Sequence, residues 1–207
     1  MTAWRNIPGW TCPRIIELYD EMARELKPGA VAVECGVAYG KSLAYLASVL
    51  DPGVDILAID IWHTFQGRTT MREAFEDARG RYIAPMQAAF MNVLDVLSDD
   101  DAGRGRHKRI EFIQARSEDV PQYLDFEVDF VFLDDHHEYE SVYAEIVAWL
   151  PKLKPGGVIA GHDVNDHYPG VERAVRAALP CRQNKIDIRP PHPDENGWGG
   201  CWRWRKP

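Results

Sequence analysis

The sequence predicts an α/β fold in which helices cover a mostly parallel sheet that ends in an antiparallel strand. Short apolar runs are typical of strands buried on both faces, and strands that alternate with helices imply a parallel sheet with right-handed crossovers. Five such runs, rich in β-branched residues, alternate with segments of helical periodicity; they are 30–34, 55–60, 110–115, 129–133 and 157–161. We therefore expect one mostly parallel sheet with helices in its connections.

The helices and the last strands follow from periodicity. The expected helices, in which apolar residues recur every three or four positions, are 11–26 within an N-terminal segment 1–29, 41–50, 141–150 and 170–179. Segments 185–189 and 200–204 are β-like and joined by a loop without room for a helix, so we expect an antiparallel pair at one edge. Trp202 and Trp204 suit either the wall of an acceptor pocket or the buried face of that edge strand.

The connection between the second and third strands is too long for an ordinary one. Within it, 71–97 favours helix with a break near Pro85, and 98–108 is a charged loop. We expect 63–108 to be a helical insertion. A lid over the site, an arm that forms a homo-oligomer and a plain surface elaboration all remain open.

Composition narrows the class of protein. The chain has 207 residues, of which 45% are hydrophobic, and this suits one domain over 1–207. Its formal net charge is -8 and no stripe of lysine and arginine is visible, so we expect no nucleic-acid partner. No apolar stretch has the length of a membrane helix, so we expect a cytoplasmic protein with no membrane partner. The cysteines are expected to be reduced thiols; they are Cys12, Cys35, Cys181 and Cys201.

A glycine-bearing turn, ECGVAYGKS, follows the first strand from Glu34 to Ser42. In an open parallel sheet such a turn faces the ligand, because Gly36 lets the backbone approach it and Gly40 leads into a helix N-terminus. A tight turn that merely needs glycine is the other interpretation. Asp60 ends the second strand, where a carboxylate can accept hydrogen bonds from both ribose hydroxyls of an adenosine group.

Polar and aromatic residues follow two further strand ends. Ile61 and Trp62 come after Asp60 and could pack against adenine, although an apolar pair in this place can equally belong to the core. Ser117 and Glu118 follow the third strand and could recognise the adenine edge. Ser117 also suits a helix N-cap, with 120–124 as the helix.

Two carboxylates are expected side by side, because Asp134 ends the fourth strand and Asp163 follows the fifth. Neighbouring anions repel each other unless something positive lies between them. Mg²⁺ or another divalent cation would serve, completed by Asn165 or by His162, which would favour a softer ion. Without an ion, Asp134 would contact substrate or cofactor and Asp163 would cap the following turn.

Taken in order, these motifs resemble those of class I S-adenosylmethionine-dependent methyltransferases over about 30–164. The matching residues are Glu34-x-Gly36-x-x-x-Gly40, Asp60, Leu133-Asp134 and the LKPGG segment at 153–157. The segments DDHHEYE at 134–140 and GHDV at 161–164 are similar to a small-molecule branch with D-x-x-H-x-Y and H-D-V, which includes the macrocin and cephalosporin-pathway O-methyltransferases. The chain departs from that branch at Asp135 and His136, where a small residue is usual after the first aspartate.

The resemblance implies a Rossmann-like sheet of seven strands whose last strand is antiparallel, with S-adenosylmethionine as cofactor. It also implies that Glu34 and Gly36 contact the methionine part of the cofactor and Asp60 its ribose. The residues expected around the cofactor are Glu34, Gly36, Tyr39, Gly40, Ser42, Asp60, Ile61, Trp62, Ser117, Glu118 and Asp134.

The expected activity is methyl transfer to a hydroxyl of a small molecule. The acceptor oxygen must lose its proton, and His137, in the histidine place of D-x-x-H-x-Y, is the expected general base beside Asp134, unless a divalent ion lowers the hydroxyl pKa. A histidine that only hydrogen-bonds its loop is the alternative role. An NAD(P)-dependent oxidoreductase and a non-catalytic cofactor-binding module remain as alternative functions. Val37 and Ala38 argue against the first, because the G-x-G-x-x-G pattern needs a second glycine there.

Overall fold

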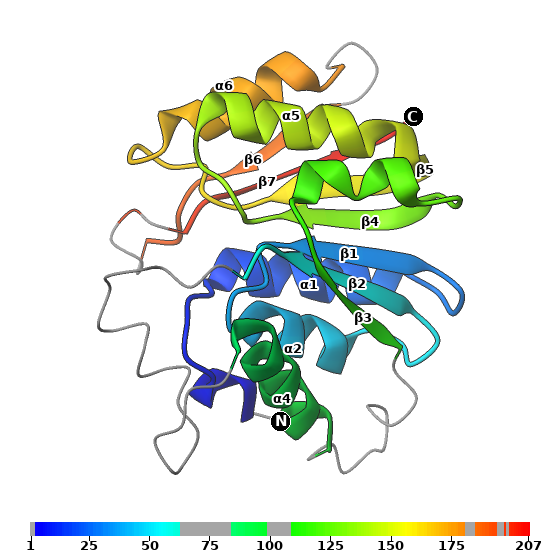
Figure 1. Cartoon of the computed structure of the whole chain (residues 1–207). Coiled ribbons are helices and arrows are strands. Elements are labelled where there is room, and N and C mark those ends of the chain that lie inside the picture. Colours follow the sequence, from blue (N-terminus) through cyan, green and yellow to red (C-terminus); the bar gives the residue numbers. More distant parts are fainter. Residues whose placement is uncertain (1–2, 63–83, 99–108, 181–184, 194–196, 198) are drawn as a thin grey trace.

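The computed structural model describes residues 3–62, 84–98, 109–180, 185–193, 197 and 199–207. Seven strands form one sheet in the order β3-β2-β1-β4-β5-β7-β6 (Figure 1). They are β1 (Val31–Cys35), β2 (Asp55–Asp60), β3 (Ile110–Gln114), β4 (Val128–Leu133), β5 (Leu153–Gly161), β6 (Asp187–Arg189) and β7 (Cys201–Arg205). Strands β1 to β5 are parallel, and β7 runs antiparallel to both β5 and β6. The predicted fold class is confirmed.

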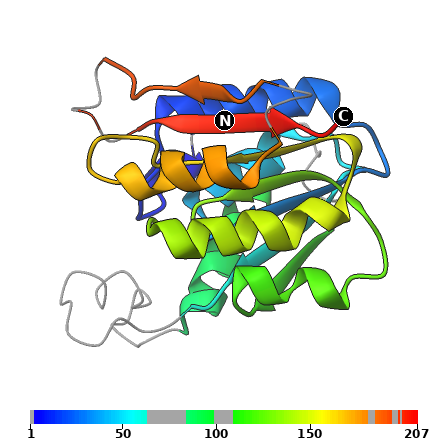
Figure 2. The same ribbon diagram turned by 90° about the horizontal axis from the view of Figure 1, so that it is seen from above.

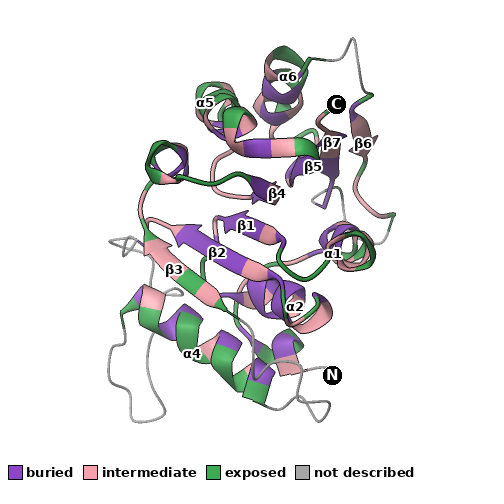
Figure 3. Cartoon of the chain, turned by 90° about the vertical axis from the view of Figure 1, so that its right-hand side faces the viewer, coloured by how far each residue is buried: buried purple, intermediate pink, exposed green. Residues whose placement is uncertain are grey.

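Helices cover both faces of the sheet (Figure 3). One face carries α1 (Pro13–Glu25), α2 (Lys41–Val49) and α4 (Pro85–Ser98). The other carries α5 (Tyr139–Trp149) and α6 (Pro169–Ala178), which lie side by side when the molecule is seen from above (Figure 2). Short 3₁₀ turns complete the description; they are η1 (Ala3–Asn6), η3 (Ser117–Asp119), η4 (Pro121–Tyr123) and η5 (Leu150–Lys152).

Side chains of strand β1 pack into both halves of the core. Ala32 packs in the cluster that contains α1 and α2, whereas Val33 and Cys35 pack in the cluster that contains α5 and α6. The side chain of Glu34 points to the α1 and α2 side, where it meets Tyr19. Because both faces are covered, apolar residues occupy nearly every position of the strand instead of alternating with polar ones.

The prediction of an α-helix after Ser117 is wrong. Ser117 does not cap a helix but begins η3, and η4 follows it directly. In an α-helix the carbonyl of Ser117 would accept the N–H of residue 121, but Pro121 has none. The carbonyl instead accepts from the N–H of Val120 at 3.4 Å, which is the tighter 3₁₀ pattern.

Strand β5 also differs from expectation, because it begins at Leu153 and includes the Pro155-Gly156-Gly157 segment. A shift in register against β4 accompanies this segment. Because Gly and Pro interrupt a run of apolar residues, the apolar pattern predicts a shorter strand than the one observed. Strands tolerate both residues at such irregularities. Trp202 and Trp204 of β7 are 1% and 2% exposed. Of the two interpretations of these side chains, the one that places them on the buried face of the strand is therefore correct.

The helical insertion after β2 is described in part. Helix α4 begins at Pro85, where the break was expected, and proline is favoured at the first position of a helix. The ranges 63–83 and 99–108, which make up most of the expected insertion, lie outside the described residues. The hypotheses that the insertion is a lid or an arm that forms a homo-oligomer therefore concern mainly residues that are not described. No helix in the described part of the chain combines the length and the apolar character that crossing a bilayer requires.

Candidate functional site

The turn after β1 is pressed against the end of β4. Gly36 has φ +86°, and a Cβ on it would lie 2.2 Å from the carbonyl oxygen of Asp134. The backbone N–H of Asp134 in turn donates to the carbonyl of Cys35 at 2.9 Å. Glycine is therefore required here by the protein's own packing, in addition to any ligand. At Gly40, the left-handed residue before α2, a Cβ would lie 3.0 Å from Val93 of α4.

Asp60 fastens the same turn from the end of β2. Its two carboxylate oxygens accept the backbone N–H groups of Ala38 at 2.7 Å and Trp62 at 2.6 Å. The indole of Trp62 donates to the carbonyl of Ala38 at 3.0 Å, and both of these residues have left-handed backbones. Burial raises the pKa of Asp60, against the hydrogen bonds from Ala38 and Trp62 that favour the carboxylate. Each carboxylate oxygen keeps capacity for a further donor.

Glu34 lies beneath the turn and is fully buried. Ser42 at the start of α2 donates to one of its carboxyl oxygens at 2.6 Å, and Tyr19 of α1 donates to the other at 3.0 Å. Burial raises the pKa of Glu34 to about 8, although these hydrogen bonds lower it. The carboxyl group is thus mostly protonated at pH 7 and joins two helices to β1.

The remaining residues expected around the cofactor form two groups, of which the first is buried. Tyr39 is buried in the core on the α2 side, and Trp62 is buried with its ring 6.1 Å from that of Phe112. Ser117 is buried too, and its hydroxyl accepts the indole N–H of Trp149 at 3.2 Å.

Two expected residues stay partly exposed at the strand ends. The carbonyl of Ile61 accepts from Gln114 at 3.0 Å. Glu118 pairs with Arg116, and although burial raises its pKa, hydrogen bonds from its own backbone and from Arg116 lower it overall.

Beyond β4 and β5, the structure brings the predicted acidic residues together around one imidazole. Nδ1 of His162 lies 3.2 Å from Oδ1 of Asp134 and 3.4 Å from Oδ1 of Asp163. Burial alone would lower the pKa of His162, but the charge of Asp134 and the hydrogen bonds to both carboxylates raise it well above the usual value. Burial raises the pKa of Asp134 itself. Nδ1 of His162 is thus placed to donate to both carboxylates, and the raised pKa favours a positive charge between them.

His137 meets the second of these carboxylates. Its Nε2 lies 2.6 Å from Oδ2 of Asp163, and its ring stacks on Tyr168 with the ring centroids 4.2 Å apart. The hydrogen bond to Asp163 raises the pKa of His137. Although burial opposes ionisation, the hydrogen bonds from both histidines hold the pKa of Asp163 well below its usual value. Each shift favours the charged form of its group, so the contact strengthens when His137 is protonated.

The residues expected to hold a hard cation fit it in part. One ligand atom each from Asp134, His162 and Asp163 lies within 4.8 Å of the others, which is compatible with a bound ion. Asn165 is arranged differently: its amide oxygen accepts the N–H groups of His167 and Tyr168, and its amide nitrogen faces Asp163 at 3.4 Å. Its oxygen is engaged by the backbone, so three of the four expected ligands converge.

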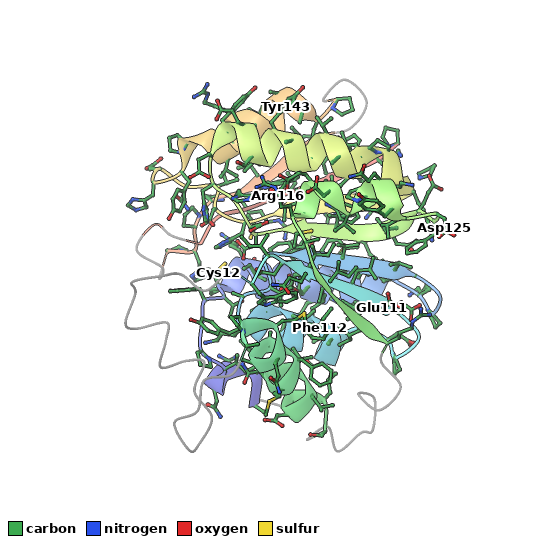
Figure 4. The ribbon with its side chains drawn as sticks, viewed as in Figure 1. Cys12, Glu111, Phe112, Arg116, Asp125 and Tyr143 are labelled. Carbon is green, nitrogen blue, oxygen red and sulfur yellow. The ribbon has the colours of Figure 1, made fainter. Side chains whose placement is uncertain are left out.

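Cys12 was not among the expected site residues, although its Sγ lies 3.3 Å from Nε2 of His162. It precedes α1, and Figure 4 shows it on the side of the molecule where β4 ends, opposite Asp125, which precedes β4. Tyr19, which holds Glu34, was missed as well. The helical spacing of Tyr19 indicates a buried position, but nothing in the sequence pairs Cys12 with the end of β5.

Comparison with known proteins gives the family. The family described as a methyltransferase domain matches residues 33–164, well over half of the chain. No curated protein matches the chain. An rRNA methylase from Streptococcus thermophilus superposes with a TM-score of 0.64 at 16% identity, covering 96% of this chain and 99% of that one.

Two O-methyltransferases have similar structures. CalS11, a TDP-rhamnose 3′-O-methyltransferase of calicheamicin biosynthesis, superposes with a TM-score of 0.61 at 20% identity, covering 91% of this chain and 77% of that one. TomG from Streptomyces achromogenes, solved with S-adenosylmethionine, gives 0.62 at 17% identity, covering 100% and 87%. At these identities the likeness shows a shared fold.

The expectation of no nucleic-acid partner is wrong as an exclusion. Structures described as rRNA methylases share this fold over nearly their whole length. The exclusion failed because net charge is a sum over the whole chain and a stripe is sought along the sequence, whereas contact with a phosphate backbone depends on charges that folding brings together from distant segments. The family match extends from within β1 to the residues just beyond β5, and it shows that the chain belongs to the methyltransferase-domain family.

Proposed function

We propose that the chain transfers the methyl group of S-adenosylmethionine to a hydroxyl of a small molecule. The observation that carries this proposal is the contact between His137 and Asp163, at the strand ends that also hold Asp134. An imidazole held in place by a carboxylate is well suited to take a proton from a hydroxyl. The small-molecule O-methyltransferases that share the fold support this class of acceptor.

Binding of the donor would use the turn after β1 and the carboxylate after β2. Gly36 offers bare backbone there, and the oxygens of Asp60 have lone pairs left for the ribose hydroxyls. We propose that Glu34 acts by holding α1 and α2 against β1, since both of its oxygens accept from side chains of the protein. Solved structures of this fold with S-adenosylmethionine or S-adenosylhomocysteine support the choice of donor.

His137 would do the acid–base work. S-adenosylmethionine supplies an activated methyl group on a sulfonium, whose transfer to oxygen is an in-line displacement. Because Nε2 of His137 is bonded to Asp163, Nδ1 is the atom that takes the acceptor proton as the new oxygen–carbon bond forms and the carbon–sulfur bond breaks. The electron pair of the broken bond stays on sulfur, and Asp163 stabilises the imidazolium.

We further propose that this transfer needs no hard cation. The imidazole of His162 already lies close to both Asp134 and Asp163, and when protonated it supplies the positive charge that Mg²⁺ would otherwise supply. Activity that requires Mg²⁺ and is lost in EDTA but restored by that ion alone would contradict this point.

The alternatives separate experimentally. Membership of a methyltransferase family decides against the NAD(P)-dependent oxidoreductase. A non-catalytic module would bind the donor and never turn it over, and it is therefore distinguished by activity alone. Membership of the macrocin and cephalosporin branch stays a prediction about the acceptor.

The experiment is calorimetric titration with S-adenosylhomocysteine, followed by an acceptor screen. We expect binding to the parent chain, no binding of NADH, and at least about 100-fold weaker binding by Asp60→Ala, because hydrogen bonds to a charged group contribute about 1.5–3 kcal/mol each. Asp55→Ala is the matched control, since it removes a carboxylate at the other end of β2. Equal affinity in Asp60→Ala and Asp55→Ala would contradict the donor site, and turnover only of an rRNA fragment would contradict the small-molecule acceptor.

A further inference from the structure

A second cluster of metal-binding side chains lies behind His162. One ligand atom each from Cys12, His162 and Cys201 lies within 4.8 Å of the other two. The three residues come from the start of α1, the end of β5 and the start of β7, so the folded chain alone brings them together. Neither thiol takes part in the methyl-transfer chemistry proposed above.

We propose that Cys12, Cys201 and His162 form a binding site for a soft divalent metal ion, of the zinc class. Two thiolates and an imidazole are the ligands that Zn²⁺ prefers, whereas Mg²⁺ prefers oxygen. The fourth position is left to water or to the carbonyl oxygen of Gly199, which lies 3.2 Å from Sγ of Cys12.

The distances suit this ion. Zinc bonds of about 2.3 Å to sulfur and about 2.0 Å to nitrogen, at tetrahedral angles, place a sulfur and a nitrogen ligand about 3.6 Å apart. Sγ of Cys12 and Nε2 of His162 are 3.3 Å apart. A shift of a few tenths of an ångström therefore opens room for the ion without rebuilding the backbone.

The orientation of His162 adds an independent argument. Its Nδ1 faces the carboxylates of Asp134 and Asp163, so this nitrogen carries the proton and donates. Nε2 is then the nitrogen that can bind metal, and it is the one that faces Cys12. A ligating histidine whose other nitrogen donates to a carboxylate is the usual outer shell of a zinc site.

The thiols are also prepared for ligation. The hydrogen bond from Cys201 and the neighbouring His162 lower the pKa of Cys12 to about 5, although burial opposes this. Burial and the neighbouring Cys12 raise the pKa of Cys201 well above its usual value. Binding of the ion requires both thiols and Nε2 of His162 to be deprotonated, so it releases protons, and the two thiolates then balance the charge of the ion.

The site would join three distant parts of the chain. Cys12 also caps α1, where its Sγ accepts the N–H of Ile15 at 3.4 Å. An ion at this point ties the N-terminal helix to β7 and to the loop that carries Asp163. Metal that binds only the folded state raises stability, so the melting temperature should rise with zinc concentration.

The test uses the full chain, stripped of metal under reductant and titrated with Co²⁺ and then Zn²⁺. We expect one Co²⁺ per chain, with a near-ultraviolet charge-transfer band that reports sulfur ligands, displaced by Zn²⁺ and unaffected by excess Mg²⁺. A cobalt spectrum without that band, or displacement by Mg²⁺, would assign the ion to the oxygen ligands of Asp134 and Asp163 and overturn the proposal.

Variants identify the ligands. Cys12→Ser keeps a good helix cap but should weaken zinc binding by more than about 100-fold, because a hydroxyl is a poor zinc ligand. Cys35→Ser is the matched control at a buried thiol outside the cluster and should bind zinc like the parent. Asp134→Asn, which alters only the partner of His162, should weaken binding about 10- to 100-fold. Circular dichroism establishes that each variant is folded, and equal affinity in folded Cys12→Ser and the parent would overturn the site. S-adenosylhomocysteine binding tests the proposed function separately.

Discussion

Nε2 of His137 lies 2.6 Å from Oδ2 of Asp163, and the two side chains form an ion pair across the ends of β4 and β5. The loop after β4 carries the histidine, and the residue that follows His162 carries the carboxylate. Asp163 has φ +63°, a left-handed backbone that aspartate tolerates better than most residues. This conformation lets one carboxylate face both His137 and His162.

The pair predicts a pH dependence of turnover. A general base acts when it is neutral, so activity should rise with pH through a pKa that Asp163 raises above the usual value for histidine. Asp163→Asn should move this acidic limb to lower pH and reduce the maximal rate, and His137→Ala should lower kcat about 10²- to 10⁴-fold. The measurement is kcat against pH. Asp166→Asn, an exposed aspartate nearby, is the control and should leave the limb in place.

The same pair predicts a pH dependence of stability. The pKa of His137 is raised on folding, so its contribution is full below the unfolded value of about 6.5 and is lost as pH rises through the folded value. The pKa of Asp163 is lowered on folding, so its contribution is full above about pH 4 and lost in acid. His137→Ala should therefore lower the melting temperature more at pH 5.5 than at pH 9. A loss independent of pH would show that the pair does not stabilise the fold electrostatically.

The buried carboxyl group of Glu34 leads us to predict a variant that gains stability, whereas His137→Ala loses it. Its pKa is raised to about 8, so folding takes up a proton, and the parent chain loses stability as pH rises from about 4.5 to about 8. Glu34→Gln has no proton to lose and should become relatively more stable over this interval, by at most about 5 kcal/mol. Thermal melts at pH 5 and pH 9 measure the difference. The exposed Glu127→Gln should show no such trend, and a Glu34→Gln profile parallel to that of the parent would contradict the buried, protonated carboxyl.

Two glycines with nearly the same backbone conformation allow the cost of backbone strain to be measured separately from the cost of a steric clash. Gly36 and Gly29 have φ of +86° and +87°, but a Cβ at Gly36 would strike the carbonyl of Asp134, whereas a Cβ at Gly29 meets nothing within 4 Å. Gly29→Ala should cost about 1 kcal/mol for its left-handed backbone. Gly36→Ala should cost at least about 2 kcal/mol more and weaken binding of S-adenosylhomocysteine. Denaturant titration compares the two, and equal losses would mean that the turn can move away from β4.

The sequence was most informative where a residue's position on a strand decides its surroundings. Strands buried on both faces are continuous apolar runs, so β2 was predicted with its observed bounds, and parallel strands bring their ends together, so Asp60, Asp134 and Asp163 were placed correctly at one edge. These arguments need no side-chain torsion angles.

What the sequence did not indicate depends on side-chain orientation or on contacts between distant segments. Ser117 turns its hydroxyl into the protein, to Trp149, and only three-dimensional packing decides that. Nδ1 of His162 faces two carboxylates, and spacing along the chain cannot give the orientation of that ring. Cys12 and Cys201 meet because β7 returns between β5 and β6, and no local pattern encodes that meeting.

That return of β7 bears on the order in which the protein can assemble during translation. Strands β1 to β5 are made first and can pair as they emerge, but until β7 is made the outer edge of β5 has no neighbour, and an open apolar edge invites wrong pairing. Trp202 and Trp204 arrive with β7 and fill the core beneath α6. A nascent chain halted before residue 201 should therefore hold the strands that carry Asp60 and Asp134 while still depending on chaperones.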